Sequence, residues 1–194
     1  MKQKLILTIM ISISFLTISV IGQSIKLGVG GGYTALTGDN SFDEENLLNL
    51  NSGYHYGGKL VVGLPLFPIQ FTGGYYINTL SSESNGFTTE TDFSSFGLGG
   101  EWSFLPGPVN PYISAEVLFT SFGDTKISFE GEDLPSDDSA ESQTGLGLGA
   151  GVYFKLLPMI DLDLSARYNM NSLFKGDEEL NSTNVRLNIL FSIL

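Results

Sequence analysis

The 194-residue sequence contains no cysteine, one histidine, and nine basic residues against 21 acidic ones. The absence of cysteine excludes a disulfide framework and a lipid-anchored cysteine. Because His55 is the only histidine, a metal site built from several histidines is excluded as well. The scarcity of basic residues argues against nucleic acid as a partner, since phosphate binding needs a positively charged surface.

Long apolar runs are also scarce. The only run that approaches the thickness of a bilayer extends from Leu5 through Ile21, behind a short basic start. This pattern predicts a secretory signal peptide over residues 1–22, with an uncleaved anchor as the alternative. The mature chain, residues 23–194, is expected to be one domain. It has seven basic and 21 acidic residues, a net charge of −14, because two lysines leave with the leader.

The sequence does contain a recurring alternation of apolar and polar residues. Near the carboxy terminus, Val185, Leu187 and Ile189 alternate with Arg186 and Asn188. A period of two places apolar side chains on one face of a β-strand and polar side chains on the other. The eight strands predicted from such stripes are Ser24–Leu36, Tyr54–Leu64, Ile69–Leu80, Asp92–Phe104, Pro111–Phe122, Gly145–Leu156, Ile160–Asn171 and Asn184–Ile193.

The segments between these strands alternate in length. The short segments contain proline and are Pro65–Pro68, Leu105–Asn110 and Leu157–Met159. The long segments are polar and are Thr37–Gly53, Ser81–Thr91, Gly123–Thr144 and Ser172–Thr183. Short turns on one side and long loops on the other are typical of barrels in outer membranes, whereas a soluble sandwich has no reason for this regularity. We therefore predict an all-β fold, an eight-stranded antiparallel up-and-down transmembrane β-barrel.

Aromatic side chains are expected to form two belts at the membrane interfaces, although aromatics also favour strands in general. The predicted belt near the short turns consists of Trp102, Phe104, Tyr112, Phe154 and Phe191. The predicted belt near the long loops consists of Tyr33, Tyr54, Tyr56, Phe93, Phe119 and Tyr168.

The polar face of the predicted strands is rich in glycine and in charge. Glycines at every second position, as in the run 145–151, suit a narrow interior with tightly curved strands. Five positive and four negative residues on this face are nearly balanced, so we expect them to pair in a poorly hydrated interior. This predicted charge network consists of Lys26, Lys59, Glu101, Glu116, Lys155, Asp161, Asp163, Arg167 and Arg186.

With these stripes, loops and aromatic residues, the chain resembles the small eight-stranded outer-membrane barrels of the OmpA/OmpX type. The resemblance covers the whole mature chain and rests on pattern rather than on a diagnostic motif. It implies a monomer in the outer membrane of a Gram-negative bacterium, in contact with outer-membrane lipid.

Residues that suggest chemistry are few. No motif around His55 supports a barrel-borne lipid-modifying enzyme, which would need a histidine with a nearby serine and an acid. The glycine run 145–151 lacks the helix and the Lys-Ser/Thr of a nucleotide loop. The acidic segment Glu130–Asp138 offers oxygen ligands for Ca²⁺ but lacks the aspartate spacing of a calcium loop, which favours a solvated loop. We therefore predict no catalytic, metal or cofactor site.

Three functions of different classes are compatible with these features. We favour a non-enzymatic scaffold that presents acidic loops at the cell surface, for envelope integrity, adhesion or binding of an unidentified surface partner. A narrow porin-like pore is the first alternative, although an eight-stranded barrel is just wide enough for its own side chains. A lipid-modifying enzyme is the second, and only His55 and scattered serines support it.

Overall fold

The computed structural model describes residues 24–37, 52–64, 67–84, 87–105, 107–129, 132–134, 142–171 and 181–193. The strands within these ranges are β1 (Ser24–Thr37), β2 (Ser52–Gly63), β3 (Ile69–Ser84), β4 (Phe87–Ser103), β5 (Val109–Phe129), β6 (Glu132–Leu134), β7 (Ser142–Leu157), β8 (Ile160–Met170) and β9 (Asn181–Ser192). Among the described residues no helix has the length and apolar character needed to cross a membrane.

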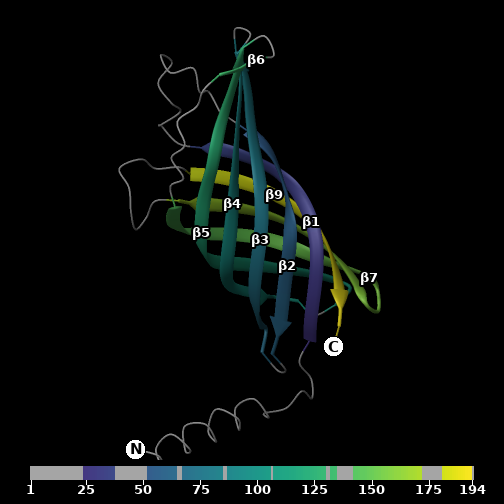
Figure 1. Ribbon diagram of the computed structural model, residues 1–194. Helices are drawn as coiled ribbons and strands as arrows, with labels where there is room; N and C mark the ends of the chain where they lie inside the picture. Colours follow the sequence, from purple (N-terminus) through teal and green to yellow (C-terminus); the bar gives the residue numbers. More distant parts are fainter. Residues whose placement is uncertain are drawn as a thin grey trace, which may run out of the picture.

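Eight of the strands close into an up-and-down barrel (Figure 1). Apart from the short β6, each strand pairs antiparallel with the next along the chain, and β9 returns to pair with β1. The closing register spans twelve residue pairs, from Lys26 opposite Ser192 to Thr37 opposite Asn181. Closure satisfies the backbone groups of the strand edges, which hydrocarbon could not do. The predicted fold class is confirmed.

The two faces of the barrel differ strongly in polarity. Outward side chains are mostly large, apolar and exposed, whereas inward side chains are mostly polar and buried. On β9, Val185, Leu187 and Ile189 point outward, while Arg186 and Asn188 are buried in the interior. The outward apolar surface is therefore the one that suits contact with lipid.

The start of β1 and the end of β9 lie at the end of the barrel that carries the short turns, which we call the short-turn end (Figure 1). The backbone N–H of Ile193 donates to the carbonyl of Ile25 at 2.7 Å, which ties the end of the chain to β1. The N–H of Lys155 donates to the carbonyl of Pro108 at 2.7 Å and links two neighbouring turns. The opposite end is called the loop end below.

The prediction of a long loop over residues 81–91 is wrong for most of these residues. β3 extends to Ser84 and β4 begins at Phe87, and these two residues are paired across the hairpin. The residues between them are Asn85 and Gly86, a dipeptide that favours tight hairpin turns. This local signal predicts a hairpin more strongly than the polar composition predicts a loop.

The predicted loop 123–144 also contains strand. β5 continues to Phe129, and β6 pairs with residues 127–129 of β5. Strands β3, β4 and β5 therefore rise above the others at the loop end, where β6 lies (Figure 1). We call residues 81–84, 87–92, 123–129 and 132–134 the projecting sheet. The predicted loops 37–53 and 172–183 lie mostly outside the described residues.

The aromatic belts differ from the prediction at two positions. Trp102 near the short-turn end, and Tyr33 and Tyr54 near the loop end, are outward and at least half exposed. Tyr112 and Phe93 are instead buried in the interior, at 1% and 7% exposure. Their position along the strand fits a belt, but the alternation of side chains places both on the inward face.

Candidate functional site

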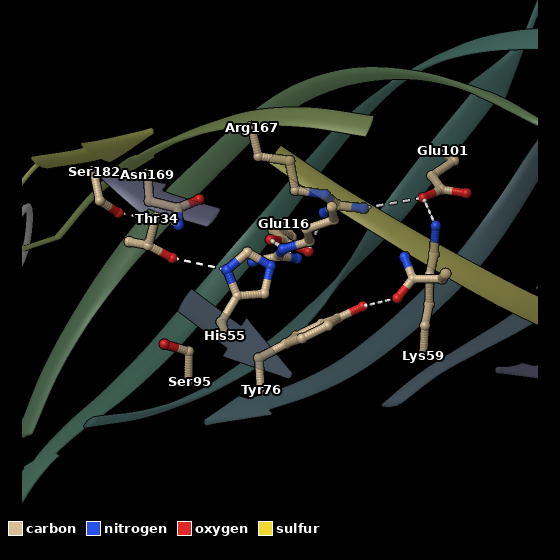
Figure 2. Close-up of polar contacts among 12 residues, drawn as sticks. Thr34, His55, Lys59, Tyr76, Ser95, Glu101, Glu116, Arg167, Asn169 and Ser182 are labelled. Atoms are coloured by element: carbon tan, nitrogen blue, oxygen red, sulfur yellow. Dashed lines mark hydrogen bonds and ion pairs between the residues drawn. The ribbon is translucent and has the colours of Figure 1, made fainter. Parts of the chain in front are cut away.

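The interior of the barrel contains a network of buried ions centred on Glu101, which is fully buried. Lys59 Nζ donates to Glu101 Oε1 at 2.7 Å, and Arg167 Nη2 donates to the same oxygen at 3.1 Å (Figure 2). The Tyr153 hydroxyl donates to the other carboxylate oxygen, Oε2. A carboxylate removed from water is tolerated only with such opposite charges and hydrogen bonds.

Lys59 connects Glu101 to a second buried carboxylate. Its Nζ lies 2.8 Å from Asp163 Oδ2, so one ammonium group bridges strands β4 and β8 from β2. Asp163 also accepts hydrogen bonds from the Tyr112 hydroxyl at 2.6 Å and from Asn188 Nδ2 at 3.1 Å. The Asp163 carboxylate thus accepts hydrogen bonds from side chains on three different strands, β2, β5 and β9.

Glu116 forms the third anionic centre and holds two arginines. Arg167 Nη1 donates to Glu116 Oε2, and Arg186 Nη1 lies 3.7 Å from Oε1. The guanidinium of Arg186 lies over the ring of Tyr76, with its Cζ 4.2 Å from the ring centroid. The Tyr76 hydroxyl donates to Asn188 Oδ1 at 2.9 Å. Because Asn188 also donates to Asp163, this hydrogen bond links the Glu116 centre to the Asp163 centre. The three centres therefore form one connected cluster.

The cluster is electrically balanced. Its charged members, which we call the ionic network, are Lys59, Arg167, Arg186, Glu101, Glu116 and Asp163. Lys26 and Asp161 form a separate pair at 2.6 Å nearer the short-turn end. The structure thus pairs eight of the nine residues of the predicted charge network. The ninth, Lys155, is exposed and forms no ion pair with any described residue.

Glycines on β7 provide the space for this cluster. A Cβ atom on Gly149 would lie 2.7 Å from Arg167 Cγ, and one on Gly151 would lie 2.5 Å from the Tyr112 hydroxyl oxygen. Both distances are shorter than real side-chain contacts, so larger residues would displace the network. The alternating glycines at 145–151 therefore mark the place where charged side chains cross the interior.

Apolar clusters lie on either side of the ionic network. The cluster toward the short-turn end consists of Val61, Tyr112, Tyr153 and Leu190, all at most 3% exposed. At the loop end, Leu80 and Phe93 pack with Leu36. Two cavities beside Arg186 and Glu116 measure about 10 Å³ each, which is room for about one water. Among the described residues, side chains thus fill the interior from one apolar cluster to the other.

His55 lies in this interior and is 2% exposed. Its Nδ1 is 2.8 Å from the Thr34 hydroxyl, which donates to Asn78 Oδ1 at 3.1 Å (Figure 2). The other ring nitrogen, Nε2, is buried without a hydrogen-bond partner. Among the described residues neither nitrogen contacts a carboxylate or a serine hydroxyl, so they do not form a Ser-His-acid arrangement there.

The described residues include no group of three or more histidine, aspartate or glutamate side chains placed to hold a metal ion. The acidic segment 130–138, considered as a calcium site from sequence, lies mostly outside the described residues.

Uncharged partners of the ionic network are absent from the sequence prediction. They are Tyr76, Tyr112, Tyr153 and Asn188. All four occupy inward positions of their strands. The alternation identifies them once it is applied to tyrosine and asparagine as well as to charged residues.

Comparison with known proteins supports the architecture. A family model described as the outer membrane protein beta-barrel domain matches residues 8–191. No curated protein matches the sequence.

Several solved structures are similar, although they share little sequence with this chain. Neisserial surface protein A is 19% identical, with a TM-score of 0.61, and the match covers 89% of this chain and 99% of that one. A major outer membrane protein from Thermus thermophilus is 14% identical with a TM-score of 0.58, over 89% and 100%. The attachment invasion locus protein of Yersinia pestis is 17% identical with a TM-score of 0.53, over 88% and 100%. At these identities the similarity shows the fold.

Proposed function

The chain belongs to the outer membrane protein beta-barrel domain family, and from this premise we propose that it is a closed, monomeric scaffold that presents an acidic surface outside the cell. Its location is the bacterial outer membrane. Residues 1–22 are proposed to act as the signal peptide for export, which leaves residues 23–194 as the barrel domain. In this family orientation the short-turn end faces the periplasm and the loop end faces outward.

The observation that carries the proposal is the filled interior. Glu101 and Asp163 are fully buried, and their shared partner Lys59 connects opposite parts of the wall. Opening a path for solutes would separate these ions in a region of low dielectric, where unpaired charges are unfavourable. The ionic network thus favours a closed barrel over a pore.

The surface available for presentation is the projecting sheet with the neighbouring acidic segments. Glu90 and Asp92 on β4 are exposed within it. Among the described residues, the paired anions of the interior are Glu101, Glu116, Asp161 and Asp163. The other 17 acidic residues of the sequence fall in the polar segments between the predicted strands or at the ends of those segments. A surface of this charge favours a partner that carries positive charge.

A structural neighbour has been crystallised with a ligand of the opposite kind of charge. The attachment invasion locus protein of Y. pestis has been crystallised with the heparin analogue sucrose octasulfate, a polyanion. The acidic loops of this chain would repel such a ligand, so we propose a different class of partner for the same kind of scaffold.

The position of His55 supports a non-enzymatic role. A residue that attacks membrane lipid has to reach the lipid or a surface open to it. His55 faces the interior, and its Nδ1 is occupied by Thr34.

Electrical recording tests the closed state. The folded chain in a planar bilayer is expected to show no steady conductance, because side chains fill the interior. A large steady conductance of the unaltered chain would support the pore instead.

A further inference from the structure

The short-turn end contains a cavity that the ionic network does not fill. Its volume is about 370 Å³, and its lining includes Lys26, Asn110, Tyr153, Lys155, Asp161 and Ser192. The cavity, which we call the vestibule, falls within the size range of small-molecule sites, roughly 300–1,000 Å³. Tyr153 lies at its inner side and stacks on Tyr112, with ring centroids 4.8 Å apart. These rings belong to the apolar cluster, so the vestibule ends inside the barrel rather than passing through it.

The vestibule has an excess of positive charge. Lys155 lies opposite Asp161 in the strand register, which is the geometry for a cross-strand ion pair. The Asp161 carboxylate is instead held by Lys26 at 2.6 Å, and Lys155 has no acidic partner among the described residues. Two ammonium groups therefore line the cavity with one carboxylate. This positive site is unusual in a chain with a net charge of −12.

A buried polar group without a hydrogen-bond partner accompanies this charge. The side-chain oxygen of Asn110 is buried and makes no hydrogen bond within the structure. The backbone on this side is fixed, because the N–H of Lys155 donates to the carbonyl of Pro108 in the adjacent turn. A ligand with an anionic group and a hydroxyl would satisfy both the Lys155 ammonium and the Asn110 amide.

We propose that the vestibule is a periplasmic binding site for a small organic anion, whose carboxylate or phosphate group binds between Lys155 and Lys26. The fixed turns form the walls and the tyrosine pair forms the floor. This site is independent of the outward-facing acidic surface, so either can exist without the other.

Titration of the folded chain in nanodiscs of zwitterionic lipid tests the site. Inorganic phosphate and L-malate are added separately at constant ionic strength, while NMR records the backbone amide shifts of Ser24, Gly107, Asn110 and Ser192. Saturable shifts at these amides are expected. Lys155→Gln should weaken binding about tenfold or more, since a charge-assisted contact is lost, whereas Lys155→Arg should retain most of it.

The matched control is Lys126→Gln, which removes an exposed lysine at the opposite end of the barrel and should leave the affinity unchanged. A further arm with phosphatidylglycerol in the nanodisc distinguishes a lipid headgroup from a free anion, because a bound headgroup would compete with phosphate. Heat-modifiable gel mobility confirms that each variant is folded. Shifts that do not saturate, or equal affinity in the folded Lys155→Gln variant, would overturn the proposal.

Discussion

Replacement of Glu101 by glutamine is expected to lower the free energy of unfolding by about 3–5 kcal/mol. Glu101 is fully buried and is the shared partner of Lys59 and Arg167. Loss of its charge leaves the ionic network with three cations and two anions in a region that water does not reach. The excess positive charge has no compensation there, which is why the effect is large.

A double substitution separates charge balance from packing. Lys59→Met restores equal numbers of cations and anions when combined with Glu101→Gln. The double variant should therefore lose at least about 1 kcal/mol less than the sum of the two single variants. Trp102 is the only tryptophan and lies on the outward face, so its fluorescence reports denaturant unfolding from lipid vesicles.

The control for Glu101 is the same substitution at an exposed position. Glu90→Gln on the projecting sheet should change the free energy of unfolding by less than about 0.5 kcal/mol. Equal, small effects at both positions would show that the buried carboxylate makes no stabilising contribution, contrary to the role assigned to the ionic network.

The second large effect on stability is expected at Gly99, one of two adjacent glycines on β4. Gly99→Ala is expected to destabilise the barrel by about 1–3 kcal/mol, because overpacking moves the backbone or neighbouring side chains. A Cβ on Gly99 would lie 2.1 Å from the carbonyl oxygen of Ala115 and 2.6 Å from Glu116 Cα, and neither atom belongs to a flexible side chain. The same methyl group on Gly100 points outward, where the nearest atom is 3.6 Å away.

Gly100→Ala therefore serves as a matched control, with the same substitution in the same strand. It should unfold within about 0.5 kcal/mol of the unaltered chain. Denaturant unfolding and heat-modifiable mobility of the two variants measure the difference. If Gly100→Ala proved as destabilising as Gly99→Ala, close packing in the interior would not be the reason that inward positions require glycine.

The barrel could be predicted from the sequence because alternation is local. A stripe such as Val185, Leu187 and Ile189 determines which face of its strand is apolar without knowledge of any other strand. The short turns are equally local, since proline and chain length indicate them. Strand ends at the loop end were less predictable, because the threonines and serines around Ser84 and Thr88 suit both polar loops and exposed strands.

The pairing of interior charges could not be deduced from the sequence in the same way. Inward parity identifies the residues, but their partners depend on the register around the closed barrel. Lys26 and Asp161 are 135 positions apart, and Lys59 meets Asp163 across 104 positions. Lys155 shows why register alone does not predict the ion pairs. Asp161 lies opposite Lys155 in the strand register but forms its ion pair with Lys26.

The outward presentation of the projecting sheet can be measured directly with single cysteines, since the natural chain has none. Glu90→Cys lies on the projecting sheet, and Met159→Cys lies in the exposed turn between β7 and β8. Intact cells are treated with a polyethylene-glycol maleimide too large to cross the outer membrane. Glu90→Cys should be labelled in intact cells, and Met159→Cys only after the outer membrane is permeabilised. Labelling of Met159→Cys in intact cells, with Glu90→Cys protected, would contradict a scaffold that presents this sheet to the outside.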